Sequence, residues 1–431
     1  MTPQSVRKFW QLARQQWQSP DRLADLQRAN LRALIAYVYD RVPYYRRLFA
    51  RQGLRQADIK GAEDLSKLPV LTRQELQRNQ PGDLLADGID LSQCLVKVTS
   101  GSTGRPLNIW RTKPEDLTRR LVWARANFAN GLRPWHRQAL IIERNLPAKD
   151  RLWLDSMRDI LGLAKLYLWC GDDVRKQVAA LRSYRPHVLL GYSQSLRLLA
   201  YSLRQSAARE IAPRIVFSSA ELLDERTRAL VREVLGVEMV DMYVSVEAGC
   251  IAWECPRHHG CHLNTDNLVV EFLRDGKPAR PGEPGHVVVT PLFARAMPLL
   301  RYDLGDVATP LEGQCPCGRG LPLMQVIQGR ADDFVTLRSG AFIYPVGTFA
   351  DIIEKEPGIV EFLVIQESLD LVVIKLVTRG ENNREIADKV RSGVEELLRH
   401  EATVKVELVD QIERGYQSKL RRIISKVPVP F

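Results

Sequence analysis

The chain has 431 residues, of which 45% are hydrophobic and 26% are charged, and its formal net charge is +11. This length allows two or three domains, and the composition is that of an ordinary globular protein. No apolar run reaches the ~18 residues that a membrane span needs, and the N-terminal MTPQSVRKFWQLARQQW is too polar for a secretory signal. We therefore expect a cytoplasmic protein with no membrane partner. The positive charge favours an anionic ligand, but the scattered basic residues match no nucleic-acid-binding motif, so no nucleic acid is expected.

The first hundred residues favour helices. Apolar residues at helical spacing line one face over residues 22–50, and Pro43 should end or bend that helix. A short helix is expected after the sequence LPVLT, because Thr72 is a suitable N-cap with Glu75 three residues later.

From about residue 96 to residue 310, apolar runs alternate with helical stretches. The runs HVLLGYS, RIVFSSA, VEMVDMYVS, LVVEFL and HVVVTPL predict strands, and residues 224–235 predict a helix between two of them. This alternation predicts a large N-terminal domain of layered α/β structure.

The polar segment QGRADD at 328–333 separates two apolar stretches and has the character of a hinge. Beyond it, residues 361–366 and 370–378 predict two strands joined by a tight turn, 382–400 an amphipathic helix and 403–409 a further strand. This β-β-α-β order predicts a smaller C-terminal α+β domain. We place the domains at residues 1–328 and 329–431.

The sequence TSGSTGRP contains a loop rich in glycine and hydroxyl residues. Its glycines permit backbone conformations that aim several N–H groups at one anion, and its hydroxyls add donors, so the loop suits phosphate oxygens. It lacks the pattern of a Walker loop. A simple flexible turn is the alternative. The candidate phosphate-binding residues are Thr99, Ser100, Gly101, Ser102, Thr103 and Gly104.

The chain also resembles the adenylate-forming superfamily of acyl-coenzyme A synthetases, luciferases and peptide-synthetase adenylation domains. The resemblance lies in six segments in the expected order: TSGSTGRP, SSAELL, DMYVSVEAG, RYDLGD, GRADD and YQSKLRR. Within the superfamily, YVYDRVPYYRRLF, LPVLTRQEL, YRPHVLLGYSQS and the C-P-C-G-R pattern are similar to the phenylacetate–coenzyme A ligase and CapK-like branch.

The resemblance implies that a carboxylate and ATP form an acyl-adenylate and pyrophosphate. In this reading Tyr243 stacks on adenine, Asp306 accepts hydrogen bonds from the ribose hydroxyls, and Arg330 approaches the ribose. Glu247 is the expected ligand of Mg²⁺, which bridges phosphate oxygens. The remaining candidates near the nucleotide are Ser219, Ala220, Glu221, Asp241 and Met242. Each of these residues also has a purely structural alternative.

Lys419 is the candidate catalytic lysine, carried on the small domain, although Ser418 stands where the family has glycine. The resemblance implies that the small domain rotates about Asp332 or Asp333. The spacing between Arg338 and Gly340 is one residue looser than in the family pattern, in a region that shapes the thiol channel of coenzyme A ligases. This difference leaves the acceptor open.

Five of the seven cysteines fall between residues 250 and 317, which in a cytosolic chain indicates a metal site before disulfides. A C-x-C pair presents two thiolates to one point, and a Cys and a His from 255–262 can complete a tetrahedron. We predict a structural Zn²⁺ on Cys255, His262, Cys315 and Cys317, as in the zinc-bearing members of the branch. His258, His259 and Cys261 are alternatives for one ligand, and reduced buried cysteines are the alternative to a metal.

The preferred function is an AMP-forming ligase that transfers an acyl group, aryl or arylacetyl, to coenzyme A or another thiol. The alternatives are an amide synthetase with an amine acceptor, a carrier-protein loading enzyme, an AMP-transferring enzyme, and a degenerate nucleotide-binding or scaffold protein. By analogy with the family, the acid pocket is expected along 142–147, 191–195, 217–220 and 243–251, with Arg144, Tyr192 and Ser245 as its polar residues. Many relatives are dimers, so a homodimer is also considered.

Overall fold

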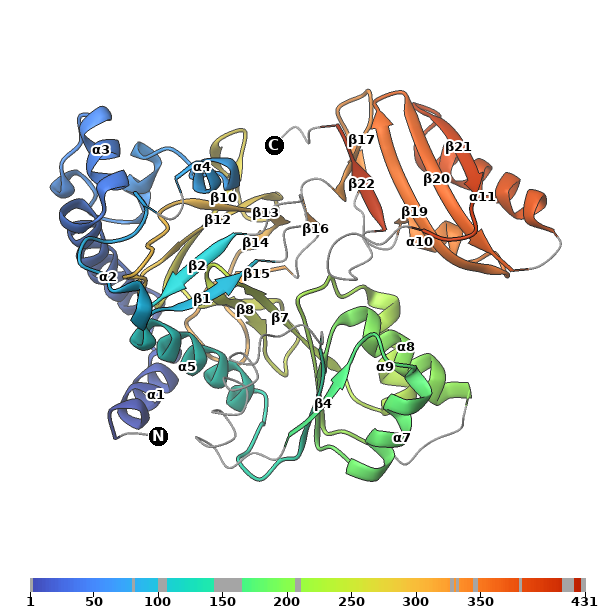
Figure 1. Cartoon of the computed structure of the whole chain (residues 1–431), viewed down its shortest axis with the longest axis horizontal. Coiled ribbons are helices and arrows are strands. Elements are labelled where there is room, and N and C mark those ends of the chain that lie inside the picture. The colour runs from blue at the N-terminus through green and yellow to red at the C-terminus, as the bar shows by residue number, and fades with distance from the viewer. Residues whose placement is uncertain are drawn as a thin grey trace.

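A computed structural model of the chain describes residues 3–79, 82–99, 107–142, 165–205, 211–325, 329–330, 333–343, 348–379, 382–412 and 422–427. A large part of α/β structure, here residues 3–330, precedes a small α+β part, residues 333–427 (Figure 1). The predicted fold class is therefore confirmed. Within the described residues, no helix has both the length and the apolar composition that crossing a bilayer requires.

Helices begin and end where local sequence signals place them. The helices are α1 Pro3–Gln15, α2 Pro20–Arg41, α3 Pro43–Arg51, α4 Arg73–Arg78, α5 Lys113–Ala129, α7 Val174–Tyr184, α8 Ser193–Gln205, α9 Glu225–Leu235, α10 Thr348–Ile353 and α11 Asn383–Leu397, with short 3-10 helices at Gln56–Asp58, Ala62–Lys67 and Leu91–Gln93. The predicted break at Pro43 is confirmed, since α2 ends and α3 begins around it. The predicted Thr72 cap is confirmed as well, because its hydroxyl accepts a hydrogen bond from the Glu75 N–H at 3.2 Å.

The large part contains a nine-stranded sheet with the order β14-β15-β9-β8-β7-β6-β5-β3-β4. Its strands are β3 Gln138–Ile142, β4 Lys165–Trp169, β5 Val188–Gly191, β6 Ile215–Ser219, β7 Met239–Ser245, β8 Gly249–Glu254, β9 Cys261–Leu263, β14 Pro310–Leu311 and β15 Leu323–Met324. From β7 to β4 the neighbouring strands are parallel, and from β7 to β14 they are antiparallel. Apolar residues of α7, α8 and α9 form one core with the parallel strands, and residues of α1 and α5 form another with β7, β8 and β15.

The large part also contains a five-stranded antiparallel sheet with the order β11-β10-β12-β13-β16. Its strands are β10 Leu268–Arg274, β11 Lys277–Pro278, β12 Gly285–Pro291, β13 Tyr302–Ala308 and β16 Gly329–Arg330. Its buried side chains share a core with α2 and α3. A separate hairpin, β1 Leu95–Val98 with β2 Asn108–Arg111, lies beside this core.

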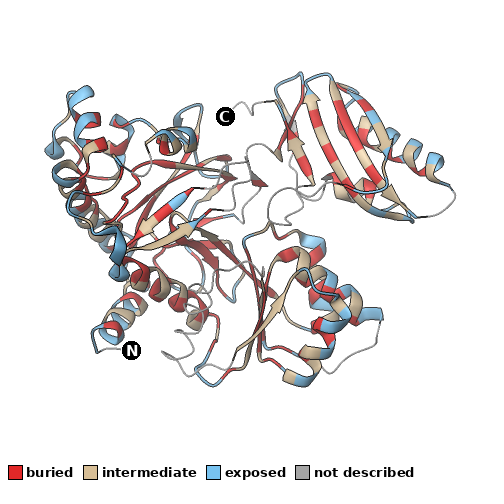
Figure 2. Cartoon of the chain, viewed as in Figure 1, coloured by how far each residue is buried: buried red, intermediate tan, exposed pale blue. Residues whose placement is uncertain are grey.

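The small part is a four-stranded sheet with the order β21-β20-β19-β22, covered by α10 and α11 (Figure 1). Its strands are β19 Ile359–Ser368, β20 Leu371–Thr378, β21 Thr403–Leu408 and β22 Ile423–Ser425, and a hairpin of β17 Val335–Thr336 with β18 Phe342–Ile343 accompanies them. The predicted hairpin, helix and third strand are confirmed, whereas β22 was not predicted. Figure 2 shows buried and partly buried residues alternating along β19, as expected when one face of a strand packs on helices.

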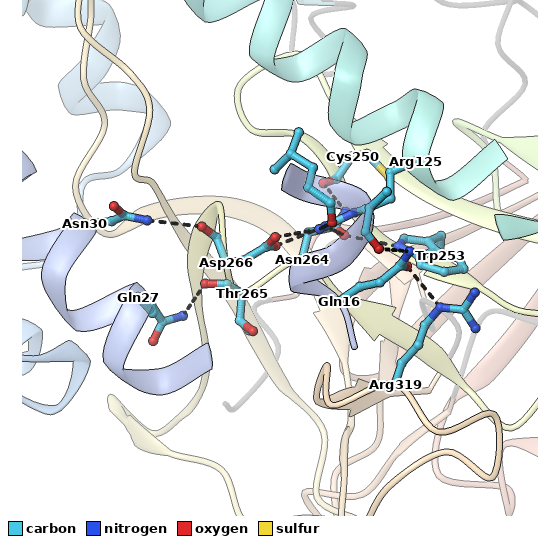
Figure 3. A network of polar contacts seen from close by, with 12 residues as sticks. Gln16, Gln27, Asn30, Arg125, Cys250, Trp253, Asn264, Thr265, Asp266 and Arg319 are labelled. Atoms are coloured by element: carbon cyan, nitrogen blue, oxygen red, sulfur yellow. Dashed lines mark hydrogen bonds and ion pairs between the residues drawn. The ribbon is translucent and has the colours of Figure 1, made fainter. Parts of the chain in front are cut away.

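A buried polar network joins α1 and α5 to the turn after β9 (Figure 3). The Arg125 guanidinium forms an ion pair with Asp266, and both side chains are completely buried. The same guanidinium donates to Leu12 O and to Asn264 Oδ1. The Nδ2 atom of Asn264 in turn donates to Cys250 O. Because a buried charge is tolerated only with partners, this network fixes the N-terminal helix against the sheet that carries the site.

Candidate active site

The predicted nucleotide-binding segments lie at the carboxyl ends of neighbouring parallel strands. The strands β5, β6 and β7 are adjacent, and they end at Gly191, Ser219 and Ser245. Loops that follow the carboxyl ends of parallel strands meet at one edge of a sheet, which is where ligands bind in open α/β folds. The topology therefore brings the segments around 192, 220 and 246 to one place.

The turn after β6 has a strained backbone. Ala220 has a φ of 65°, in the left-handed region that residues with a side chain rarely adopt. The next residue, Glu221, accepts a hydrogen bond from the Gln194 N–H at 3.0 Å, which ties this turn to the start of α8. Non-glycine residues in this conformation are concentrated at functional sites, so the turn is a candidate ligand contact.

Tyr243 and Asp306 come together from two different sheets. The Tyr243 hydroxyl on β7 donates a hydrogen bond of 2.8 Å to Asp306 Oδ2 on β13. Asp306 is paired in register with Arg330 of β16. Three residues predicted to surround adenine and ribose thus lie where the nine-stranded and five-stranded sheets meet.

The described end of the glycine-rich loop is fixed by its first residue. Thr99 donates its N–H to Leu107 O at 2.9 Å, and its hydroxyl accepts from the Leu107 N–H at 3.0 Å. Thr99 is buried, and Arg73 of α4 approaches its hydroxyl at 3.4 Å. The hairpin β1–β2 thus joins Thr99 to Leu107, and a cationic side chain lies beside Thr99.

Two arginines hold the turn that carries Glu247. Arg119 of α5 donates to the carbonyl oxygens of Ser245, Val246 and Glu247 at 2.8–2.9 Å, and Arg111 of β2 also donates to Val246 O. Burial lowers the pKa of Arg119 well below its usual value, a shift to which Arg111 adds and which Asp116 and Glu247 oppose. A single guanidinium therefore fixes three consecutive carbonyl groups of the β7–β8 turn.

The Glu247 carboxylate lies in an electrostatic group with Tyr302 and Arg73. Burial raises the pKa of Tyr302 above its usual value; the negative charge of Glu247 adds to this shift and the positive charge of Arg73 opposes it. Arg73 also approaches Thr99, so this cation lies near both Tyr302 and the first residue of the expected phosphate loop.

Two other predicted residues on β7 have buried side chains. Met242 packs in the core that contains Val240 and Trp253. Asp241 is buried beside Glu254, which accepts the Asp241 N–H at 2.8 Å and two hydrogen bonds from Arg228. Burial, reinforced by the negative charge of Glu254, raises the pKa of Asp241 to about 7.

Several predicted residues fall outside the described part of the chain. They are Ser100, Gly101, Ser102, Thr103, Gly104, Arg144, Asp332 and Lys419. Of the proposed acid pocket, the residues Tyr192, Ser218, Ser219 and Ser245 are described, and Ser245 Oγ accepts from the Ala248 N–H at 2.9 Å.

Known proteins are similar to this chain over most of its length. A family model described as the CapK C-terminal domain matches residues 337–426. The phenylacetate–coenzyme A ligase of Thermus thermophilus is 29% identical over 86% of this chain and 85% of its own length, and the Escherichia coli ligase of the same name is 28% identical over 78% of each. Protein CapK of Staphylococcus aureus is 21% identical over 84% of this chain and 80% of its own length.

The chain is therefore similar over most of its length to phenylacetate–coenzyme A ligases and to CapK. Solved structures share its fold. A 2-hydroxyisobutyryl-coenzyme A ligase in the postadenylation state, 20% identical, superposes over 96% of this chain and 91% of its own with a TM-score of 0.79. The same ligase in the thioesterification state, over the same shares, gives 0.67.

The chain also has a Cys/His cluster, whose cysteines lie in the core that α1 and α5 form with β7, β8 and β15. One ligand atom each from Cys255, His262, Cys315 and Cys317 lies within 4.8 Å of all the others. The Sγ atoms of Cys255 and Cys315 are 3.7 Å apart, and Cys317 Sγ is 3.4 Å from His262 Nε2. A tetrahedral Zn²⁺ with bonds of about 2.3 Å to sulfur and 2.0 Å to nitrogen separates two sulfurs by about 3.8 Å, and a sulfur and a nitrogen by about 3.5 Å. Both distances therefore match those expected between the ligands of a zinc ion.

The electrostatics of the cluster are consistent with a metal site. Burial lowers the pKa of His262 to about 4, so its ring is neutral near pH 7, the form that ligates a metal. Burial alone would raise the pKa of Cys317, but hydrogen bonds from Arg319 hold it below the usual thiol value. Two of the alternative ligands have other surroundings: His258 faces Glu254 at 3.6 Å, and Cys261 is buried in the core that the five-stranded sheet shares with α2 and α3.

Sequence reasoning missed the residues that support the turn of Glu247. Arg111 and Arg119 have Asp116 close by in the sequence, but nothing in the sequence links them to residues 245–247, and a basic residue in a helix is more often on a solvated face. The one available signal was the capping box of Thr112 and Glu115, which predicts where α5 begins and hence which of its residues face β8.

Proposed function

We propose that the chain is an ATP-dependent ligase that activates a carboxylic acid as an acyl-adenylate, releases pyrophosphate and transfers the acyl group to coenzyme A. The observation that carries the proposal is the hydrogen bond between Tyr243 and Asp306, with Arg330 paired beside them. An aromatic ring next to a carboxylate suits a nucleoside, because the ring stacks on the base and the carboxylate accepts the two ribose hydroxyls.

The phosphates would extend from this point toward Thr99. The hydroxyl and amide donors of the loop that begins there, together with the Arg73 guanidinium, would hold the triphosphate oxygens. Mg²⁺ would supply charge neutralisation between phosphate oxygens, and Glu247 is its proposed ligand. Arg119 and Arg111 fix the backbone of that ligand, so the carboxylate keeps its position when the ion arrives.

Lys419 is the proposed catalytic cation. An ammonium brought near the α-phosphate and the acid carboxylate would offset the negative charge that accumulates as these two anions react. It lies three residues before Arg422, which forms an ion pair with Glu354 within the small part.

We propose an aryl or arylacetyl acid, because four relatives that match over 74–96% of their own length are named phenylacetate–coenzyme A ligases. Tyr192 and Ser245 would line its pocket at the carboxyl ends of β5 and β7. The looser spacing of Arg338 and Gly340 keeps an amine, a carrier protein or retained AMP as outcomes of the test below.

We further propose that Zn²⁺ occupies the Cys/His cluster and has a structural role. Bound zinc would crosslink the turn before β9 to the turn at 315–317. We also propose that residues 1–328 and 329–431 act as two domains, with the boundary near β16.

The test is pyrophosphate release from Mg·ATP with phenylacetate, benzoate and a short aliphatic acid, followed by mass spectrometry of products with coenzyme A or an amine. We expect release with an aryl or arylacetyl acid, and its coenzyme A thioester as product. Asp306→Asn should lower the rate at least tenfold, whereas Asp370→Asn, at an exposed position of the small part, should not. No pyrophosphate with any acid would refute the proposal.

A further inference from the structure

The carboxylate of Glu354 receives an arginine from each of the two parts of the chain. Glu354 lies at the end of α10 in the small part, where its N–H donates to Ala350 O. Arg197 of α8, in the large part, is 2.5 Å from Glu354 Oε2, and Arg422, just before β22, is 2.6 Å from Oε1. One carboxylate thus joins a helix of the large part to the last strand of the small sheet.

This contact is better shielded from water than an ordinary surface ion pair. The side chains of Arg197, Glu354 and Arg422 are 13%, 19% and 26% exposed. Arg197 lies over the ring of Tyr201 and Arg422 over the ring of Phe362, which restricts both guanidinium groups. Shielding and restricted side chains both raise the contribution of an ion pair above that of exposed pairs.

A second contact lies one turn earlier on α10. Arg226 of α9 donates to Ala350 O at 3.3 Å. The helices α8 and α9 therefore both reach α10, and Figure 1 shows the small part beside these two helices.

The position of Arg422 connects this contact to the reaction. The segment that carries Lys419 leads into Arg422 and then into β22, which pairs with β19. Holding Arg422 through Glu354 therefore fixes one end of that segment relative to α8. The whole chain also superposes better on the postadenylation state than on the thioesterification state of one and the same ligase, with TM-scores of 0.79 and 0.67 over equal coverage.

We propose that Glu354 is a positioning residue. Through its ion pairs with Arg197 and Arg422 it stabilises the arrangement of the two parts that is used for adenylation, and the Arg197–Glu354 contact breaks when the parts rearrange for acyl transfer. This inference rests on the proposed ligase function. The proposal predicts opposite effects on the two half-reactions: the Arg197–Glu354 contact supports adenylation and opposes the rearrangement that acyl transfer needs.

The test is Arg197→Ala, because this variant leaves the Glu354–Arg422 pair within the small part intact. Arg204→Ala is the matched control: Arg204 is two turns further along α8, lies over the same Tyr201 ring, and its nearest ion-pair partner is Glu233 of the large part at 4.0 Å. We expect Arg197→Ala to slow ATP–pyrophosphate exchange roughly tenfold, the size of one charge-assisted hydrogen bond, and to leave acyl transfer from a synthetic acyl-adenylate to coenzyme A unchanged or faster. Arg197→Lys should restore part of the exchange rate.

Small-angle X-ray scattering gives a readout that does not require activity. The radius of gyration should increase for Arg197→Ala and Glu354→Gln and should match the wild type for Arg204→Ala. Equal scattering of Arg197→Ala and wild type, or equal slowing of both half-reactions, would overturn the inference. If the wild type activates no acid, the proposed function fails, and the scattering comparison still decides whether the contact holds the two parts together.

Discussion

The buried ion pair of Arg125 and Asp266 should be a main determinant of the stability of the large part. We consider Arg125→Met, which keeps much of the side-chain volume and removes every donor. The change deletes two hydrogen bonds to the Asp266 carboxylate, at 2.5 and 3.0 Å, and those to Leu12 O and Asn264 Oδ1 (Figure 3). Because both side chains of the pair are 0% exposed, Asp266 would remain as an uncompensated buried charge.

The expected loss in the free energy of unfolding is about 3–5 kcal/mol, the range for removing one partner of a buried ion pair. The assay is urea denaturation followed by far-UV circular dichroism, compared with Arg28→Ala. The Arg28–Asp25 pair has side chains that are 43% and 73% exposed, so its loss should change the free energy of unfolding by less than about 0.5 kcal/mol.

A double variant tests the cause of the loss. If the penalty comes from the unpaired carboxylate, then Arg125→Met combined with Asp266→Leu should recover at least half of it, because an apolar pair of similar size can replace a buried ion pair. A loss below about 1 kcal/mol for Arg125→Met alone, or no recovery in the double variant, would refute the reasoning.

Three further predictions concern the site. Elemental analysis should find about one zinc per chain, and Cys317→Ser should lower that content whereas Cys94→Ser, outside the cluster, should not. Arg119→Met, which removes the donors to three carbonyl groups, should raise the Mg²⁺ concentration for half-maximal pyrophosphate exchange at least tenfold; an unchanged value would show that the turn of Glu247 is held by other contacts. Asp241→Asn should be more stable than the wild type at pH 8 and close to it at pH 4. The folded state raises the pKa of Asp241 to about 7, so the wild type loses stability as pH rises from about 4 to 7, by up to about 4 kcal/mol; equal urea midpoints at both pH values would contradict this.

Much of the local structure followed from the sequence, because it depends on residues that are close together in the chain. Pro43 separates α2 from α3, Thr72 caps α4, and the alternation of apolar runs and helices gives the parallel strands. The motif order also predicted the superfamily, since six segments in register depend on sequence alone.

The candidate site could be predicted as a set of residues but not as an arrangement. The sequence predicted His262 as a ligand with His258 as an alternative, and the fold decides between them, because β9 aligns His262 with the cysteines while His258 faces Glu254. Likewise, Tyr243 and Asp306 are 63 residues apart, and their hydrogen bond exists because two sheets meet between them.

By itself, therefore, the sequence determined the fold class, the chemical types of residue at the site and the order of the predicted helices and strands, which did not include β22. Only the tertiary structure decided that Arg119 supports the turn of Glu247 and that Glu354 joins α8 to the last strand. The physical reason is that a charged side chain shows no periodicity or spacing that reveals its partner. Its role depends on burial and on a contact that distant segments create only when the chain has folded.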